Sequence, residues 1–147
     1  MTALTARQHW AHIALGMQQD VASYQALQDL LHAQFHAALR HDVQAMQTVA
    51  EQITEQASQL DAARKARVEH VRALLPQGVR PSMTEAIAQL QGGLQRQLLA
   101  LWQQLEAQVQ ACKAQNVRNC QLIMEQAQIM RQVMGVEAAQ EGIYAPR

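Results

Sequence analysis

The amino-acid sequence predicts an all-α protein, an antiparallel helical bundle of coiled-coil type in which two shorter helices pack on one long C-terminal helix. Two observations lead to this prediction. Alanine, glutamine and leucine, which tolerate helices well, dominate the composition, and aromatic residues make up only 3% of the 147 residues. Apolar residues also recur at steps of three and four along most of the chain, which is the pattern of one apolar face on a helix.

The first helix is predicted over residues 9–40. Its apolar positions lie three or four residues apart: Ile13, Met17, Val21, Tyr24, Leu27, Leu31, Phe35 and Ala38. His41 and Asp42 form a weak break, and Asp42 is of the type that caps the start of a helix. The apolar pattern resumes after this break and predicts a second helix over residues 42–75.

The clearest boundary is the segment 76–81, where two prolines flank a glycine. Ser82 follows, with Glu85 three residues later, which is the pattern of a capping box at a helix start. From there an apolar face continues to Met134. The sequence therefore predicts a third helix over residues 82–134, about 75 Å long, with the two shorter helices packed along it.

These helices form a single helical domain over residues 1–135, followed by a flexible tail over residues 136–147 that is small and polar. No segment has the roughly 18 consecutive apolar residues of a transmembrane helix. The N-terminus lacks the apolar run of a signal peptide. We therefore expect a cytoplasmic protein.

Two asparagines, Asn116 and Asn119, occupy the apolar face of the third helix, where leucine would be expected. An asparagine in a helix–helix seam costs stability and fixes the register of the helices. Beyond Asn119 the same face becomes rich in methionine, which suits adaptable partner binding. Two interpretations stay open: this end is ordinary core, or it lacks a partner in the free protein and binds another chain.

The charges and motifs exclude several classes of function. Lys+Arg and Asp+Glu number 12 each, so nucleic-acid binding is not expected. The short basic cluster Arg64, Lys65 and Arg67 is interpreted as a solvated helix face.

No Glu-x-x-His motif and no glycine-rich phosphate loop occurs, so we expect no enzyme and no cofactor. His32 and His36 have metal-ligand spacing, but the other histidines form no second motif, and we expect no metal.

The segment from Asn116 to Ile123, followed by an amphipathic helix and by Tyr144 in a small polar tail, resembles the C-terminal part of the FlgN family of flagellar type III export chaperones. The stretch from Leu60 to Leu75, the glycine-containing loop and the helix start at Met83 agree with this resemblance. The chain departs from the family pattern where Cys120 stands in place of a glycine and where alanine follows the tail tyrosine.

The resemblance implies a cytoplasmic bacterial chaperone without a cofactor, whose clients are the hook–filament junction proteins. It implies that Tyr144 helps dock the chaperone on the cytoplasmic domain of the export gate at the membrane. Carried onto this sequence, the client-binding residues are Asn119, Leu122, Ile123, Ile129, Met130, Val133 and Met134. The alternatives are a structural or adaptor coiled-coil protein that acts by self-association, for example as a homodimer, and a metal-binding helical bundle.

Overall fold

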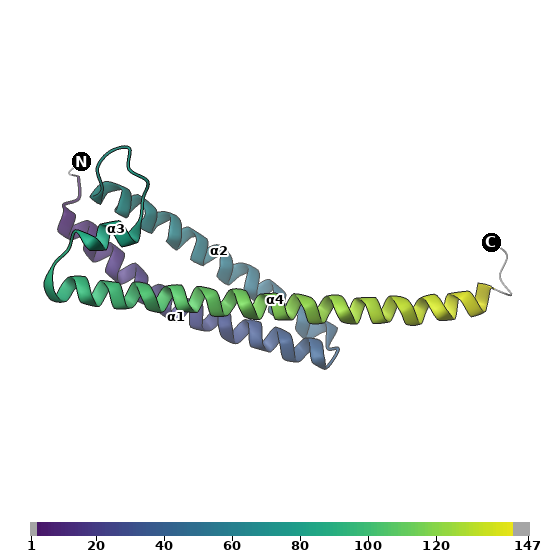
Figure 1. Ribbon diagram of the computed structural model, residues 1–147. Coiled ribbons are helices and arrows are strands. Elements are labelled where there is room, and N and C mark those ends of the chain that lie inside the picture. Colours follow the sequence, from purple (N-terminus) through teal and green to yellow (C-terminus); the bar gives the residue numbers. More distant parts are fainter. Residues whose placement is uncertain (1–2, 143–147) are drawn as a thin grey trace.

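The computed structural model describes the backbone of residues 3–142 and the side chains of residues 3–135. It contains four helices: α1 (Ala6–Leu39), α2 (Val43–Leu74), α3 (Met83–Ala88) and α4 (Gly92–Gly142). Helix α1 packs against both α2, which runs antiparallel to it, and α4, which runs parallel to it (Figure 1). The predicted all-α fold, with two shorter helices on one long C-terminal helix, is confirmed for the described residues.

Helix α1 begins three residues earlier than predicted because Thr5 caps it. The backbone N–H of Gln8 donates to the Thr5 hydroxyl at 3.2 Å, and the backbone N–H of Thr5 donates to the Gln8 side-chain oxygen at 2.8 Å. This reciprocal pair satisfies two donors that a helix start leaves free. At the other end His41 adopts a positive φ of 54°, and the Asp42 carboxylate accepts the Ala45 N–H at 3.0 Å, which starts α2.

The prediction of a single helix over residues 82–134, with a kink or a close helix contact at Gly92 and Gly93, is wrong because the segment forms two helices. The chain leaves the helix after Ala88, and Gly92 adopts φ of 67°, a left-handed conformation that glycine tolerates without strain. The break divides the segment into α3 and α4. It lets α3 lie between α2 and α4 at one end of the molecule (Figure 1), with Met83, Ala86 and Ile87 buried.

Helix α4 also ends later than predicted, at Gly142 instead of Met134. Gly135 costs a helix interior only about 1 kcal/mol, and the alanine, glutamine and glutamate residues after it are good helix formers. Residues 136–142, which the sequence assigned to a tail, are therefore helical. The rest of the predicted tail, residues 143–147, lies outside the described residues.

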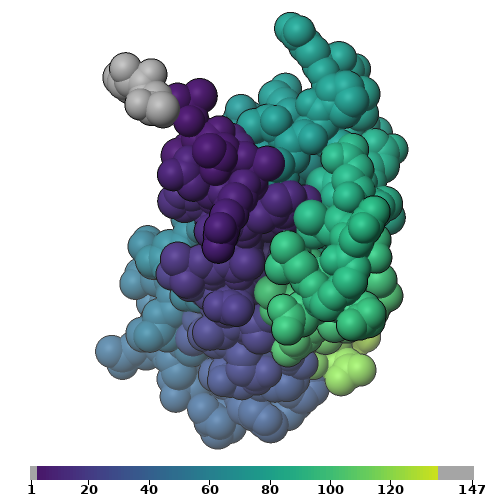
Figure 2. Space-filling model, turned by 90° about the vertical axis from the view of Figure 1, so that its left-hand side faces the viewer, coloured from purple at the N-terminus to yellow at the C-terminus, as the bar shows by residue number. Residues whose placement is uncertain are grey.

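The main core lies at one end of the molecule, among the start of α1, the end of α2, α3 and the first half of α4. Figure 2 looks onto this end and shows the surfaces of these segments side by side. Its buried residues are Ile13, Met17, Val71, Leu75, Met83, Ala86, Ile87, Leu98 and Leu105. Toward the α1–α2 turn, the buried positions of α4 become small or polar, at Cys112, Gln115 and Asn119. Apolar packing of α4 therefore weakens along its length, and polar contacts take over.

A buried ion pair links three helices beside this core. The Arg67 guanidinium of α2 donates to the Asp20 carboxylate of α1, and the two side chains are only 12% and 5% exposed. The guanidinium carbon of Arg67 also lies 5.8 Å from the centre of the Trp102 ring of α4, within cation–π range. The interpretation of the basic cluster as a solvated face is thus wrong for Arg67, although Arg64 and Lys65 are exposed and pair with Asp61.

Candidate functional site

Helix α4 is attached to α1 by side chains that donate hydrogen bonds to backbone carbonyl oxygens of α1. The four bonds are Gln108 Nε2 to Val21 O at 3.0 Å, Cys112 Sγ to Tyr24 O at 3.8 Å, Asn119 Nδ2 to Leu31 O at 2.7 Å and Gln126 Nε2 to Ala38 O at 2.8 Å. Each joins residues 87 or 88 positions apart. A constant separation means that the two helices run parallel and stay in register, and we call this contact the α1–α4 seam.

Three of these donors, Cys112, Asn119 and Gln126, follow one another at seven-residue steps that continue the spacing of Leu98 and Leu105. They therefore occupy one heptad position, which is apolar in an ordinary coiled coil. Burial raises the pKa of the Cys112 thiol, so this thiol stays protonated and can donate its hydrogen bond. Within the described residues Cys112 and Cys120 are both free thiols, as the sequence predicted.

Asn119 is the most completely buried polar side chain of the seam, with 1% of its surface exposed. Its amide nitrogen also lies 2.8 Å from the side-chain oxygen of Gln34, and its oxygen accepts the amide of Gln115 at 2.8 Å. The second seam residue is therefore Gln115, not Asn116, which is exposed. Because Asn119 faces α1, it is not accessible to a partner, unlike the other residues predicted to bind a client.

Replacing Asn119 with alanine should destabilise the protein by about 2–3 kcal/mol, because the change leaves buried partners on α1 and α4 without a hydrogen bond. Chemical denaturation followed by circular dichroism measures the effect. Asn116→Ala, three residues away on the exposed side of the same helix, should change the free energy of unfolding by less than about 0.5 kcal/mol. Equal effects of the two substitutions would contradict the assignment of Asn119 to the seam.

Past Gln126 helix α4 continues without α1, which ends at Leu39 (Figure 1). Four apolar residues there are largely exposed: Ile129 at 60%, Met130 at 57%, Val133 at 49% and Met134 at 60%. Leu122 and Ile123, just before them, are half-buried. We call these six residues the distal face of α4: Leu122, Ile123, Ile129, Met130, Val133 and Met134.

The distal face is a continuation of the α1–α4 seam. Ile129 and Val133 lie 14 residues, or two heptads, after the seam residues Gln115 and Asn119. At about 100° per residue, all six members lie on the side of α4 that faces α1 further back. The four members after Gln126 are exposed because α1 is too short to cover them. Of the two interpretations left open by the sequence, ordinary core is therefore wrong for residues 129–134 of the described protein.

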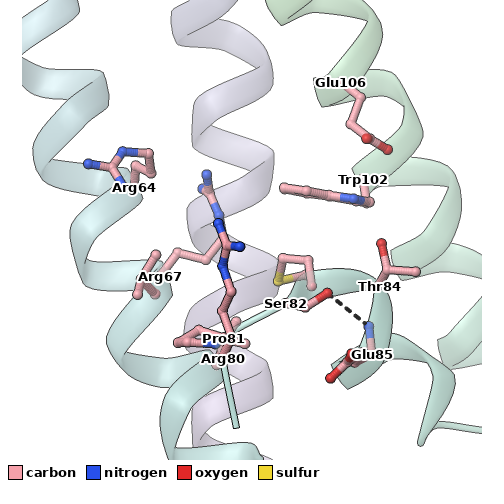
Figure 3. Close-up of a pocket in the computed structure, with 12 residues that line it drawn as sticks. Arg64, Arg67, Arg80, Pro81, Ser82, Thr84, Glu85, Trp102 and Glu106 are labelled. Carbon is pink, nitrogen blue, oxygen red and sulfur yellow. Dashed lines mark hydrogen bonds between the residues drawn. The ribbon is translucent and has the colours of Figure 1, made fainter.

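A separate hollow of about 530 Å³ lies between α2, α3 and α4 (Figure 3). Arg64, Arg67 and Arg80 line one side of it, and Trp102 and Glu106 line the other. The first two arginines are already paired with aspartates. The lining also contains two glutamates, Glu85 and Glu106, against the remaining arginine, Arg80, so the formal charges of the hollow do not favour an anion.

The described part of the chain contains neither a metal-binding cluster nor a helix that could span a membrane. His32 and His36 are exposed on α1, and over the described chain no cluster of three or more histidine, cysteine or acidic side chains is arranged to hold a metal ion. None of the helices, as far as the chain is described, has the length and apolarity needed to cross a bilayer. Tyr144 lies outside the described residues.

Comparison with known proteins gives a family assignment. The family model described as FlgN protein matches residues 12–142, from the first turns of α1 to the end of α4. Searches of curated proteins and of solved structures found no match. The match includes the whole seam and the whole distal face, as well as the segment from Asn116 to Ile123 that suggested the resemblance. The chain belongs to the FlgN family, a family of chaperones for flagellar protein export.

Proposed function

We propose that this chaperone binds the hook–filament junction proteins through the distal face of α4 and delivers them to the flagellar type III export gate. The observation that carries the proposal is the exposure of the distal face in the free protein. Ile129, Met130, Val133 and Met134 form an apolar stripe on a helix that no other described helix covers. An exposed apolar stripe at helical spacing is suited to a partner helix that buries its own apolar face against it.

The chemistry of the distal face favours adaptable recognition over charge-based recognition. Two of its six members are methionines, whose unbranched side chains adjust to differently shaped partners. Between Asn119 and Gly135 the only charged residues are Glu125 and Arg131, and their formal charges cancel. A client is thus selected by the spacing of its apolar residues, and the affinity should depend weakly on salt.

Delivery to the export gate rests on the family resemblance. Tyr144 is our candidate for contact with the cytoplasmic domain of the gate, and it lies only two residues after the end of α4. The proposed client face and the proposed docking residue are therefore close in the sequence, so that a bound client would be held next to the gate.

The substitution Met130→Asp tests the client face. It should weaken binding of a purified hook–filament junction protein at least about tenfold, because it places a charge in the centre of an apolar contact. Isothermal titration calorimetry measures the affinity. Gln128→Asp adds the same charge on the opposite side of α4 and should leave the affinity within about twofold. If both variants bind equally well, the client does not contact the distal face.

Sedimentation distinguishes the client-binding proposal from self-association. If the distal face is kept for a client and does not pair with a second copy of the chain, the mass measured without client should not depend on concentration. A mass that doubles with concentration, and that Met130→Asp returns to one chain, would favour the adaptor alternative.

A further inference from the structure

Three histidines gather where the start of α1 meets the end of α2, at the end of the molecule opposite the distal face. The Nδ1 atoms of His9 and His70 lie 2.9 Å apart, within hydrogen-bond distance. The ring of His12 stacks on that of His70, with 4.9 Å between the ring centres and 6° between the planes. His9 and His70 are partly buried, so this histidine cluster is part of the contact between the two helices.

The Nδ1–Nδ1 contact limits how many protons the cluster can hold. One of the two nitrogens must donate a proton, and the other must accept it with a free lone pair. The pair can therefore take up a proton only on a ring nitrogen that leaves this acceptor free. A proton on the accepting Nδ1 makes both Nδ1 atoms donors and breaks the contact between the two rings.

Few negative charges near the cluster are free to offset added positive charge. No acidic residue lies in the first turn of α1, whose N-terminus itself disfavours cations. On α2, Glu69 lies 3.7 Å from Arg72, and Arg67 is paired with Asp20. Burial lowers the pKa of His70 below its ordinary 6.5, and the charges of His12 and His9 add to this effect.

We propose that the histidine cluster is a proton-sensitive junction that holds the start of α1 on the end of α2 at neutral pH and releases it when the accepting Nδ1 of the His9–His70 pair is protonated. Release would uncover the buried core residues Ile13 and Val71, which directly follow His12 and His70 in the sequence. The folded protein favours the neutral cluster, while the unfolded chain protonates its histidines near pH 6.5. The contribution of the junction to stability is therefore present above about pH 6.5 and declines as the pH falls below it.

Hydrogen exchange of the full chain without client tests this proposal at pH 7.5 and pH 5.5, after correction for the intrinsic effect of pH. We expect protection of the amides in the first turns of α1 and the last turn of α2 to fall at least about tenfold at pH 5.5. Amides of α4 around Asn119 should not change. His70→Gln should remove this pH dependence, and His32→Gln, on the exposed side of α1, should retain it.

A second measurement covers the case in which His70→Gln loosens the junction at every pH. In the unaltered protein, nuclear magnetic resonance should show the ring of His70 titrating below the ordinary range of histidine. The proposal is overturned if the ring of His70 titrates in the ordinary range, or if protection at the junction is the same at both pH values. Neither readout involves a client, so failure here leaves the proposed client face standing.

Discussion

A chain that ends at Ala127 should fold as the full protein does and yet bind no hook–filament junction protein. This truncation retains every hydrogen bond of the α1–α4 seam, the last of which joins Gln126 to Ala38. It also retains the whole core cluster, none of whose buried residues lies beyond Leu105. It removes Ile129, Met130, Val133 and Met134, which are exposed and contribute little to folding.

We expect the affinity for a junction protein to fall more than about 100-fold. If only two of the removed side chains each contribute about 2 kcal/mol of binding free energy, their loss already exceeds that factor. The free energy of unfolding should change by less than about 1 kcal/mol. A chain that ends at Gly142 retains all of α4 and is the matched control. It should bind the client normally. If both truncations lose the client, residues 143–147 contain the binding site and the distal face does not.

The largest loss of stability from one substitution is expected for Asp20→Ala. The change leaves the Arg67 guanidinium, which is only 12% exposed, buried without its counter-charge. Removing one partner of a buried ion pair costs about 3–5 kcal/mol. That is a large part of the total stability of a small domain, and for a chain of this size it corresponds to a fall in Tm of roughly 10 °C. Thermal and chemical denaturation measure it.

Two further variants test whether the lost stability comes from leaving the buried Arg67 without a counter-charge or simply from losing an ion pair. In Asp20→Ala combined with Arg67→Met, no unpaired charge remains and most of the stability should return. Asp61→Ala removes an exposed carboxylate that pairs with Arg64 and Lys65, and should have little effect because water already solvates those side chains. If Asp20→Ala is no worse than Asp61→Ala, the buried pair does not hold α1 and α2 together.

The helices could be predicted because each depends on local signals. The apolar spacing marks α1 and α2, and Ser82 caps α3 by accepting the backbone N–H of Glu85 at 3.3 Å (Figure 3). In the sequence the pair Gly92 and Gly93 indicates a kink or a close helix contact, but it does not show that the helix ends there. Whether two glycines are tolerated or end a helix depends on what the flanking turns can bury. Because the chain folds back before Gly92, the apolar side chains of α3 are buried in the core. The described part of α4 has no such packing around Gly135, and the helix continues through it.

The candidate site was predicted in outline, but its polar seam was not. The apolar, methionine-rich stripe after Asn119 is visible in the sequence, and so is its helical spacing. The roles of Gln108 and Gln126, which donate to α1, and of Gln115, which donates to Asn119 on α4 itself, are not, because an exposed glutamine and one that makes such a bond look alike in a single sequence. The seven-residue spacing of Cys112, Asn119 and Gln126 was the one signal that could have identified the seam.

The short length of α1 relative to α4 has a consequence for how this protein can change. Residues 129–134 take no part in the core, so substitutions among them should have almost no effect on folding. The requirement for a stable fold, which excludes most substitutions at buried positions, does not restrict these residues. On our proposal that they bind the client, a new client preference would need only single substitutions, while the seam and the core keep the fold unchanged.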